Sequence, residues 1–156
     1  MVEITRVDKW LVERLSQNVT LTTLLGGAKI YQEEAPANAV YPYVVYYDSS
    51  EYGNDINGVA AKRNAVETNY IVLAVTAGRS YQSLQAIADA IDSVLTGAQG
   101  NSGTGVNVLG TYRERSVRYT EDFQSTDKNK RNVTENEART RVVYLGGEYK
   151  IIACEA

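Results

Sequence analysis

One stretch near the middle of the chain, Thr68–Gly97, most constrains the fold because it combines a buried strand with an amphipathic helix. Both faces of Tyr70–Thr76 are largely apolar, which is typical of a strand covered on each side. Ser80 stands at the position of a helix N-cap, and Gly97 supplies a C-terminal stop. The helix between them has one apolar stripe, formed by Leu84, Ile87, Ala88, Ile91 and Leu95.

The flanking segments predict the rest of an α+β fold. The expected elements are a helix at Glu3–Gln17, a short turn at Leu21–Leu25, and strands at Ala28–Tyr31, Tyr41–Asp48, Val106–Tyr119, Ala138–Leu145 and Glu148–Cys154. Pro42 belongs at a strand start or on an edge. Gly146-Gly147 either turns the chain back or forms a bulge in one longer strand. We therefore expect a mostly antiparallel sheet of five or six strands, with two helices packed on one face.

The length of 156 residues fits a single domain covering residues 1–156. Two long loops are expected, near 49–67 and 120–136. The first, Ser49–Glu67, is either a long loop or a loosely paired hairpin that Asn57-Gly58 closes. The second, Thr120–Asn136, has many charges and few apolar residues, so we expect a mobile loop.

The composition argues against catalysis, cofactors and metals. The chain contains no histidine, the commonest acid–base residue and metal ligand, so its one thiol, Cys154, has no histidine to activate it. The glycines of Gly97–Gly105 follow a helix and precede a strand, the reverse of a phosphate-binding loop, so a linker is expected. The carboxylate pairs Asp89/Asp92 and Glu135/Glu137 are interpreted as solvated surface rather than a cation site.

Charge and hydropathy limit the remaining classes. The net charge is −3 with scattered basic residues, which argues against a dedicated nucleic-acid surface. No stretch approaches about 18 apolar residues, so no membrane span is expected. The N-terminal segment MVEITRVDKW lacks an apolar signal core, so no cleaved secretion signal is expected.

Tyrosine is unusually frequent, with 12 residues against one Phe and one Trp. Tyrosines fall on both faces of the predicted strand Tyr41–Asp48, which reflects either strand preference or contact with another subunit. Basic residues between 113 and 131 are interleaved with acids. They indicate either a loop near DNA or an acidic partner, or a solvated hairpin end, which the acids favour. The predicted interface residues are Tyr47, Tyr52, Lys62, Arg63, Arg113, Arg115, Arg118, Lys128, Lys130 and Arg131.

Several local strings carry a family resemblance. They are Leu21–Leu25 with Gly26-Gly27, then Lys29-Ile30-Tyr31, Ala35-Pro36 and Tyr41-Pro42-Tyr43-Val44-Val45, followed by strand Tyr70–Thr76 and the helix with Ala88-Asp89-Ala90. In this order they resemble the tail terminator, or tail completion, proteins of long-tailed bacteriophages. The likeness spans about Leu11 to Leu145.

The resemblance implies an α+β virion subunit, assembled in the host cytoplasm, that forms a ring of six. Such a ring caps the tail tube, stops its growth and joins the head connector, while DNA passes through without specific binding. It implies no catalysis, no cofactor and no membrane. The long loops and the segment after Gly146 depart from the family pattern, so a neighbouring neck or tail component stays open. A small ligand-binding or enzymatic α+β domain with a tyrosine-lined pocket is the alternative from another class.

Overall fold

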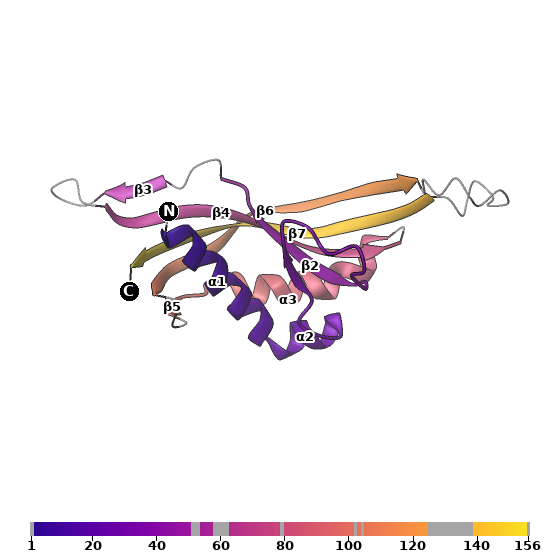
Figure 1. Cartoon of the computed structure of the whole chain (residues 1–156), viewed down its shortest axis with the longest axis horizontal. Coiled ribbons are helices and arrows are strands. Elements are labelled where there is room, and N and C mark those ends of the chain that lie inside the picture. The colour runs from indigo at the N-terminus through magenta and orange to yellow at the C-terminus, as the bar shows by residue number, and fades with distance from the viewer. Residues whose placement is uncertain are drawn as a thin grey trace.

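The computed structural model describes residues 2–50, 54–57, 63–78, 80–101, 103, 105–124 and 139–155, and Figure 1 shows their arrangement. The helices in this part of the chain are α1 (Val2–Gln17), α2 (Val19–Leu25) and α3 (Gln85–Leu95), with one 3-10 turn, η2 (Tyr81–Leu84), leading into α3. The strands are β1 (Ile30–Gln32), β2 (Tyr43–Asp48), β3 (Asn54–Asn57), β4 (Arg63–Ala77), β5 (Gly100–Asn101), β6 (Val106–Gln124) and β7 (Arg139–Glu155).

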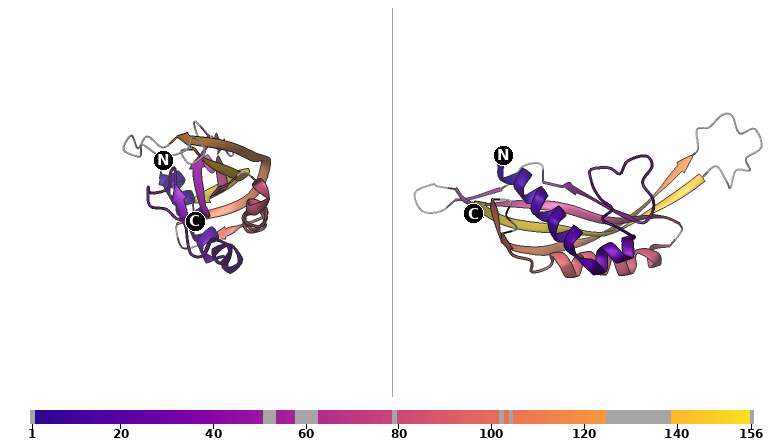
Figure 2. Two further views of the ribbon diagram at one scale, coloured as in Figure 1. Left: turned by 90° about the vertical axis from the view of Figure 1, so that its right-hand side faces the viewer. Right: turned by 60° about the horizontal axis from the view of Figure 1, so that its bottom comes forward.

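These strands form one sheet in the order β1-β2-β4-β7-β6-β5, and short β3 pairs with the part of β4 beyond β2. Every described pair is antiparallel except β1 with β2. The helices lie together on one face of this curled sheet (Figures 1 and 2). The α+β class and the mostly antiparallel sheet are confirmed. A third helix, α2, replaces the predicted short turn because Asn18 caps it, its Oδ1 accepting from the Leu21 amide at 2.8 Å.

Each face of the sheet carries its own apolar cluster. On the helix face, Trp10, Leu11 and Leu15 of α1 and Ile91 and Leu95 of α3 are fully buried, and the last two belong to the apolar stripe predicted for the central helix. The opposite face has a smaller cluster, built on Val45, Ile71, Leu73, Val75 and Val142. The central strand is therefore covered on both sides, as its apolar sequence predicts. None of the helices in the described ranges is long and apolar enough to cross a membrane.

The predicted boundaries of the central helix hold at both ends. The Ser80 hydroxyl accepts a hydrogen bond from the Gln82 amide at 3.1 Å, so Ser80 is the expected cap, here of the 3-10 turn. Gly97 has φ +76°, a conformation that glycine adopts without the steric cost of a side chain. The stretch Gly97–Gly105, predicted as a linker, contains the two-residue strand β5 paired with β6.

The predicted loop Ser49–Glu67 is corrected in part. Asn54–Asn57 is β3 and pairs antiparallel with β4, which begins at Arg63, so the hairpin alternative is the one the structure shows. The Gly58 end of the proposed Asn57-Gly58 turn lies outside the described residues. β4 begins at Arg63, before the apolar run that predicted a strand from Tyr70. The residues ahead of Tyr70 are mostly polar, and pairing with β3 on one side and β7 on the other keeps them in the strand.

The loop prediction for Thr120–Asn136 was wrong at its start, since β6 continues to Gln124. Polar residues stay in the strand because they pair with β7 through Gln124↔Arg139. Residues 125–138 lie outside the described part of the chain.

Gly146-Gly147 does not reverse the chain, because β7 runs through both glycines as one strand of 17 residues. The register shifts lie in β6 instead. One falls between Val108 and Gly110; at the other, Arg113 and Arg115 face the consecutive residues Tyr149 and Glu148, and Glu114 is the extra residue. The glycines serve close approach: a Cβ on Gly146 would lie 1.9 Å from the Val72 carbonyl oxygen.

Candidate assembly interface

The outer edge of β6 is the longest open strand edge in the described chain. Of its 19 residues, β5 pairs only with Asn107 and Val108, and the Thr111 carbonyl accepts the Gly97 amide at 2.7 Å. From Tyr112 to Gln124, no described residue pairs with the side of β6 that faces away from β7. Two large apolar side chains of this strand are exposed, Leu109 at 47% and Tyr112 at 45%. Such an edge is a ready template for a strand of another molecule.

The bulge at Glu114 divides the predicted arginine cluster between the two faces. The pairing of Arg113 with Tyr149 and of Arg118 with Leu145 places both on the helix face, whereas Arg115 pairs with Glu148 and lies on the opposite face. A regular strand would have put Arg113 and Arg115 together. The structure therefore does not bring the three into one basic patch.

The two helix-face arginines contact α3 and η2. Arg113 Nη1 lies 3.3 Å from Asp92 Oδ1, and the buried Tyr149 hydroxyl donates to the same oxygen at 3.1 Å. Burial and the Asp92 carboxylate raise the pKa of Tyr149 above its usual value. The Arg118 guanidinium lies 5.8 Å from the centre of the Tyr81 ring. These contacts join the helix layer to β6 within one molecule.

Arg115 and Tyr47 share a polar row on the opposite face. Arg115 pairs with the Glu148 carboxylate, which also accepts from the Ser49 hydroxyl at 3.0 Å. The Arg115 hydrogen bond lowers the pKa of Glu148, although burial acts against it. Strand registers place Tyr47 in the same row through Ile71, and burial raises its pKa.

A second polar contact continues along this face. Lys150 Nζ lies 2.8 Å from Glu114 and 2.5 Å from Glu67, and the hydrogen bonds to these carboxylates raise the Lys150 pKa. Its positive charge is thus matched inside the molecule, as is that of Arg115.

The remaining predicted interface residues are not placed side chain by side chain. Arg63 opens β4, but its side chain is outside the described part of the structure. Tyr52, Lys62, Lys128, Lys130 and Arg131 lie wholly outside the described residues.

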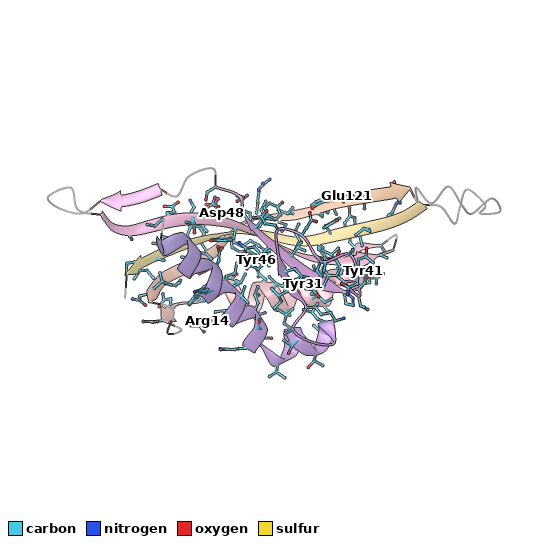
Figure 3. The ribbon with its side chains drawn as sticks, viewed as in Figure 1. Arg14, Tyr31, Tyr41, Tyr46, Asp48 and Glu121 are labelled. Carbon is cyan, nitrogen blue, oxygen red and sulfur yellow. The ribbon has the colours of Figure 1, made fainter. Side chains whose placement is uncertain are left out.

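A tyrosine-lined groove of about 720 Å³ occupies the other half of this face. The segment before β2 forms one wall, and side chains of β2, β6 and β7 form the other. Five lining residues are tyrosines, three are glutamates, and the remainder are small or apolar: Tyr41, Tyr43, Tyr47, Tyr119 and Tyr144; Glu33, Glu34 and Glu121; Ala35, Pro36, Ala37, Ala39 and Val45. Figure 3 labels Tyr41 and Glu121, which come from these separate segments.

Four of the five tyrosines form two stacked pairs. The Tyr119 and Tyr144 rings are 4.2 Å apart with an interplanar angle of 11°, and the Tyr41 and Tyr43 rings are 5.2 Å apart at 15°. The Tyr144 hydroxyl donates to Glu121 Oε2 at 3.0 Å. Burial, followed by the nearby Tyr41, Tyr31 and Glu121 groups, raises the pKa of Tyr43 to about 12. Tyr43 is therefore neutral at physiological pH.

The sequence pointed to the tyrosines of Tyr41–Asp48, three of which line the groove, and to a tyrosine-lined pocket as the alternative, but not to Tyr119, Tyr144 or the three glutamates. The excess of tyrosine was the available signal, and the alternation along Tyr41–Asp48 separates Tyr43 and Tyr47 from Tyr46, which is buried on the helix face. Nothing in the sequence indicated that Tyr119 and Tyr144 meet them. Among the described residues there is no group of three His, Cys, Asp or Glu side chains placed to hold a metal ion.

Comparison with known proteins identifies the family. A family model described as tail completion protein gp17 matches residues 9–141. This chain belongs to that family. The family resemblance stated from local strings is thus confirmed, and no curated protein sequence matches the chain.

Solved structures support the fold of this family member. One chain in the "Virion of native gene transfer agent (GTA) particle" is 15% identical, with a TM-score of 0.57 over 91% of this chain and 91% of that chain. At that identity, the likeness shows the fold alone. A second solved structure, 12% identical with a TM-score of 0.45 over 96% of this chain and 93% of that chain, is too distant to add to it.

Membership gives the tail completion protein its broad role. It is a structural component of a phage-type virion tail, and it assembles with other tail and head components. The open β6 edge and the groove on the face opposite the helices are two candidate contact surfaces in the described part of the chain.

Proposed function

We propose that this tail completion protein is a tail terminator, whose copies form a ring of six that caps the tail tube and joins it to the head connector. The observation that carries the proposal is the open edge of β6. A ring needs one surface on each copy that meets a different surface on the next, and a long free strand edge supplies one. The stretches 49–67 and 120–136, with Tyr52, Lys62, Arg63, Lys128, Lys130 and Arg131, are proposed to add contacts between copies or with adjoining rings.

The charge distribution supports passage of DNA without specific binding. The net charge is −3, and three described arginines face carboxylates of their own molecule: Arg113 with Asp92, Arg115 with Glu148 and Arg141 with Asp122. Affinity for phosphate grows with each unpaired cation that a surface presents. We expect the ring to bind duplex DNA weakly even at low salt, and tight binding in a filter or mobility assay would contradict this.

The ring itself is tested by measuring mass with the tail tube protein from the same genome. Light scattering and electron microscopy of the chain, alone and with assembled tubes, should reveal a ring of about 103 kDa (six times 17.2 kDa) or the same ring at tube ends. Tubes that stay bare and keep elongating in the presence of the chain would overturn the proposal.

Two neighbouring proline variants test the β6 edge. Successive residues in a strand direct their amides to opposite sides, so of Ser116 and Val117 one amide faces β7 and the other faces the open edge. One variant, Ser116→Pro or Val117→Pro, should lower monomer stability by breaking the ladder to β7. The other should leave the melting temperature nearly unchanged and prevent ring formation. Rings formed by both variants would exclude this edge from the contact.

The tyrosine-lined groove favours a second candidate, a ligand-binding α+β domain. A chain that remains monomeric with tail tubes, and whose melting temperature rises with a small organic ligand, would support that candidate instead.

A further inference from the structure

The groove combines flat aromatic surfaces with unbalanced negative charge. The Tyr119–Tyr144 pair and the Tyr41–Tyr43 pair each present stacked rings, and Tyr41 is 38% exposed. Stacked tyrosines offer an electron-rich face to a cation and an apolar surface to its alkyl stem.

Three carboxylates surround these rings. Glu33 and Glu34 come from the segment after β1, and Glu121 comes from β6, and all three are exposed. No lysine or arginine is among the described residues that line the groove. In the adjoining polar row, by contrast, each carboxylate has a cationic partner: Arg115 pairs with Glu148, and Lys150 pairs with both Glu67 and Glu114.

We propose that this groove binds an arginine side chain carried on an extended segment of a partner protein. The guanidinium stacks between the tyrosine pairs and pairs with Glu121, which the Tyr144 hydroxyl holds at the rim. Glu33 and Glu34 add attraction from the opposite wall.

Arginine suits the site better than lysine for geometric reasons. A planar guanidinium stacks on a ring face and meets a carboxylate with two parallel hydrogen bonds, whereas an ammonium is a compact, strongly hydrated charge. The groove volume of about 720 Å³ also exceeds what one side chain fills, which leaves room for the backbone on either side of the arginine. The inference concerns the groove alone and does not depend on ring formation.

The test uses the intact chain and three blocked tripeptides, Ac-Gly-Arg-Gly-NH2 and its lysine and citrulline counterparts. Citrulline keeps the shape of arginine but carries no charge. Titration followed by NMR of the tyrosine rings should give at least tenfold tighter binding for arginine than for citrulline, with lysine between them. Tyr144→Phe assigns one of the responding rings while keeping its stacking surface.

Variants separate the groove from general charge attraction. Glu121→Gln should weaken arginine binding several-fold, whereas Asp89→Asn, which removes an exposed carboxylate from α3, should leave it unchanged. Circular dichroism checks that both variants fold. Equal binding of arginine and citrulline, or equal losses in the two variants, would overturn the proposal. So would self-association that Glu121→Gln abolishes, since a second copy would then occupy the groove.

Discussion

At Gly146, β7 passes close to the backbone of β4, and Gly146→Ala measures how much stability depends on that approach. A Cβ at this position would lie 1.9 Å from the Val72 carbonyl oxygen and 3.0 Å from Leu73 Cα. Ordinary contact begins at 3.4 Å, so the added carbon would be about 1.5 Å too close to the oxygen. The atoms in the way are backbone, so no rotamer change relieves the clash.

The expected loss of stability in Gly146→Ala depends on how far the backbone must shift to relieve the clash. Overpacked cores lose about 1–3 kcal/mol when side chains yield, and here a buried strand must shift against its own ladder, so we expect a loss of about 3 kcal/mol or more. The ladder is continuous from Ala77↔Val142 to Val66↔Ala153, which leaves little local freedom. For a chain of this size the melting temperature should fall by roughly 6–12 °C.

Two further glycines complete the series. At Gly147 the nearest atom is the flexible Arg113 Cδ at 2.9 Å, followed by the Arg115 carbonyl at 3.1 Å, so alanine there should cost less. At Gly110 nothing lies within 4 Å, and alanine should leave stability unchanged or slightly higher. Urea denaturation and thermal scans of all three variants give the order. If Gly146→Ala were as stable as Gly110→Ala, the close β4–β7 approach would be refuted.

Three other variants test the core and the pH dependence of stability. Ile91→Ala, at a fully buried site in α3, should lower the free energy of unfolding by about 2–5 kcal/mol in urea denaturation. Val19→Ala, at an exposed site, should lower it by less than about 0.5 kcal/mol. The pKa of Glu148 is lowered, so its ionised form stabilises the fold above pH 4.5, and this stabilisation is lost as the pH falls. Glu148→Gln should therefore lower the melting temperature at pH 7, and the gap between variant and wild type should shrink in acid. Burial raises the pKa of Asp8 above 3.8, so the ionised carboxylate destabilises the folded state once the pH exceeds that value. Asp8→Asn should therefore raise the melting temperature at pH 7 and leave it unchanged below pH 3.8, where Asp8 is protonated in both states.

The fold was predictable where one face of an element is apolar. The stripes of α1 and α3 and the two-sided Tyr70–Thr76 run have strong periodicity, and burial of such patterns leaves few arrangements. Local chemistry also fixed ends, as at Ser80 and Gly97. The resemblance to the tail completion family also depends on short structural strings, among them strand Tyr70–Thr76 and the helix that follows it.

Strand extensions were not predictable because pairing, and not composition, holds them. Thr120–Gln124 carries charges and no apolar alternation, yet it stays extended opposite β7. The bulge at Glu114 could not be predicted either, because no glycine or other bulge-forming residue marks that position in the sequence. That single extra residue decides which arginine faces which side, so a basic cluster in sequence is no cluster on the surface.

The groove shows a further limit, because it depends on how far the sheet curls. Tyr43 and Tyr47 of β2 are separated from Tyr144 of β7 by β4, which contributes no lining residue. The two tyrosine sets line one groove because their large side chains lie over the smaller, buried Leu73 and Val75 of β4, on the curled sheet that Figure 2 shows. Gly146 belongs to the same face as Tyr144 and Glu148 by alternation and lets β7 come close to β4. A clash at Gly146 should therefore disturb arginine binding as well as stability, whereas Glu121→Gln should weaken binding at unchanged stability. Measuring both quantities in both variants separates the shape of the groove from its charge.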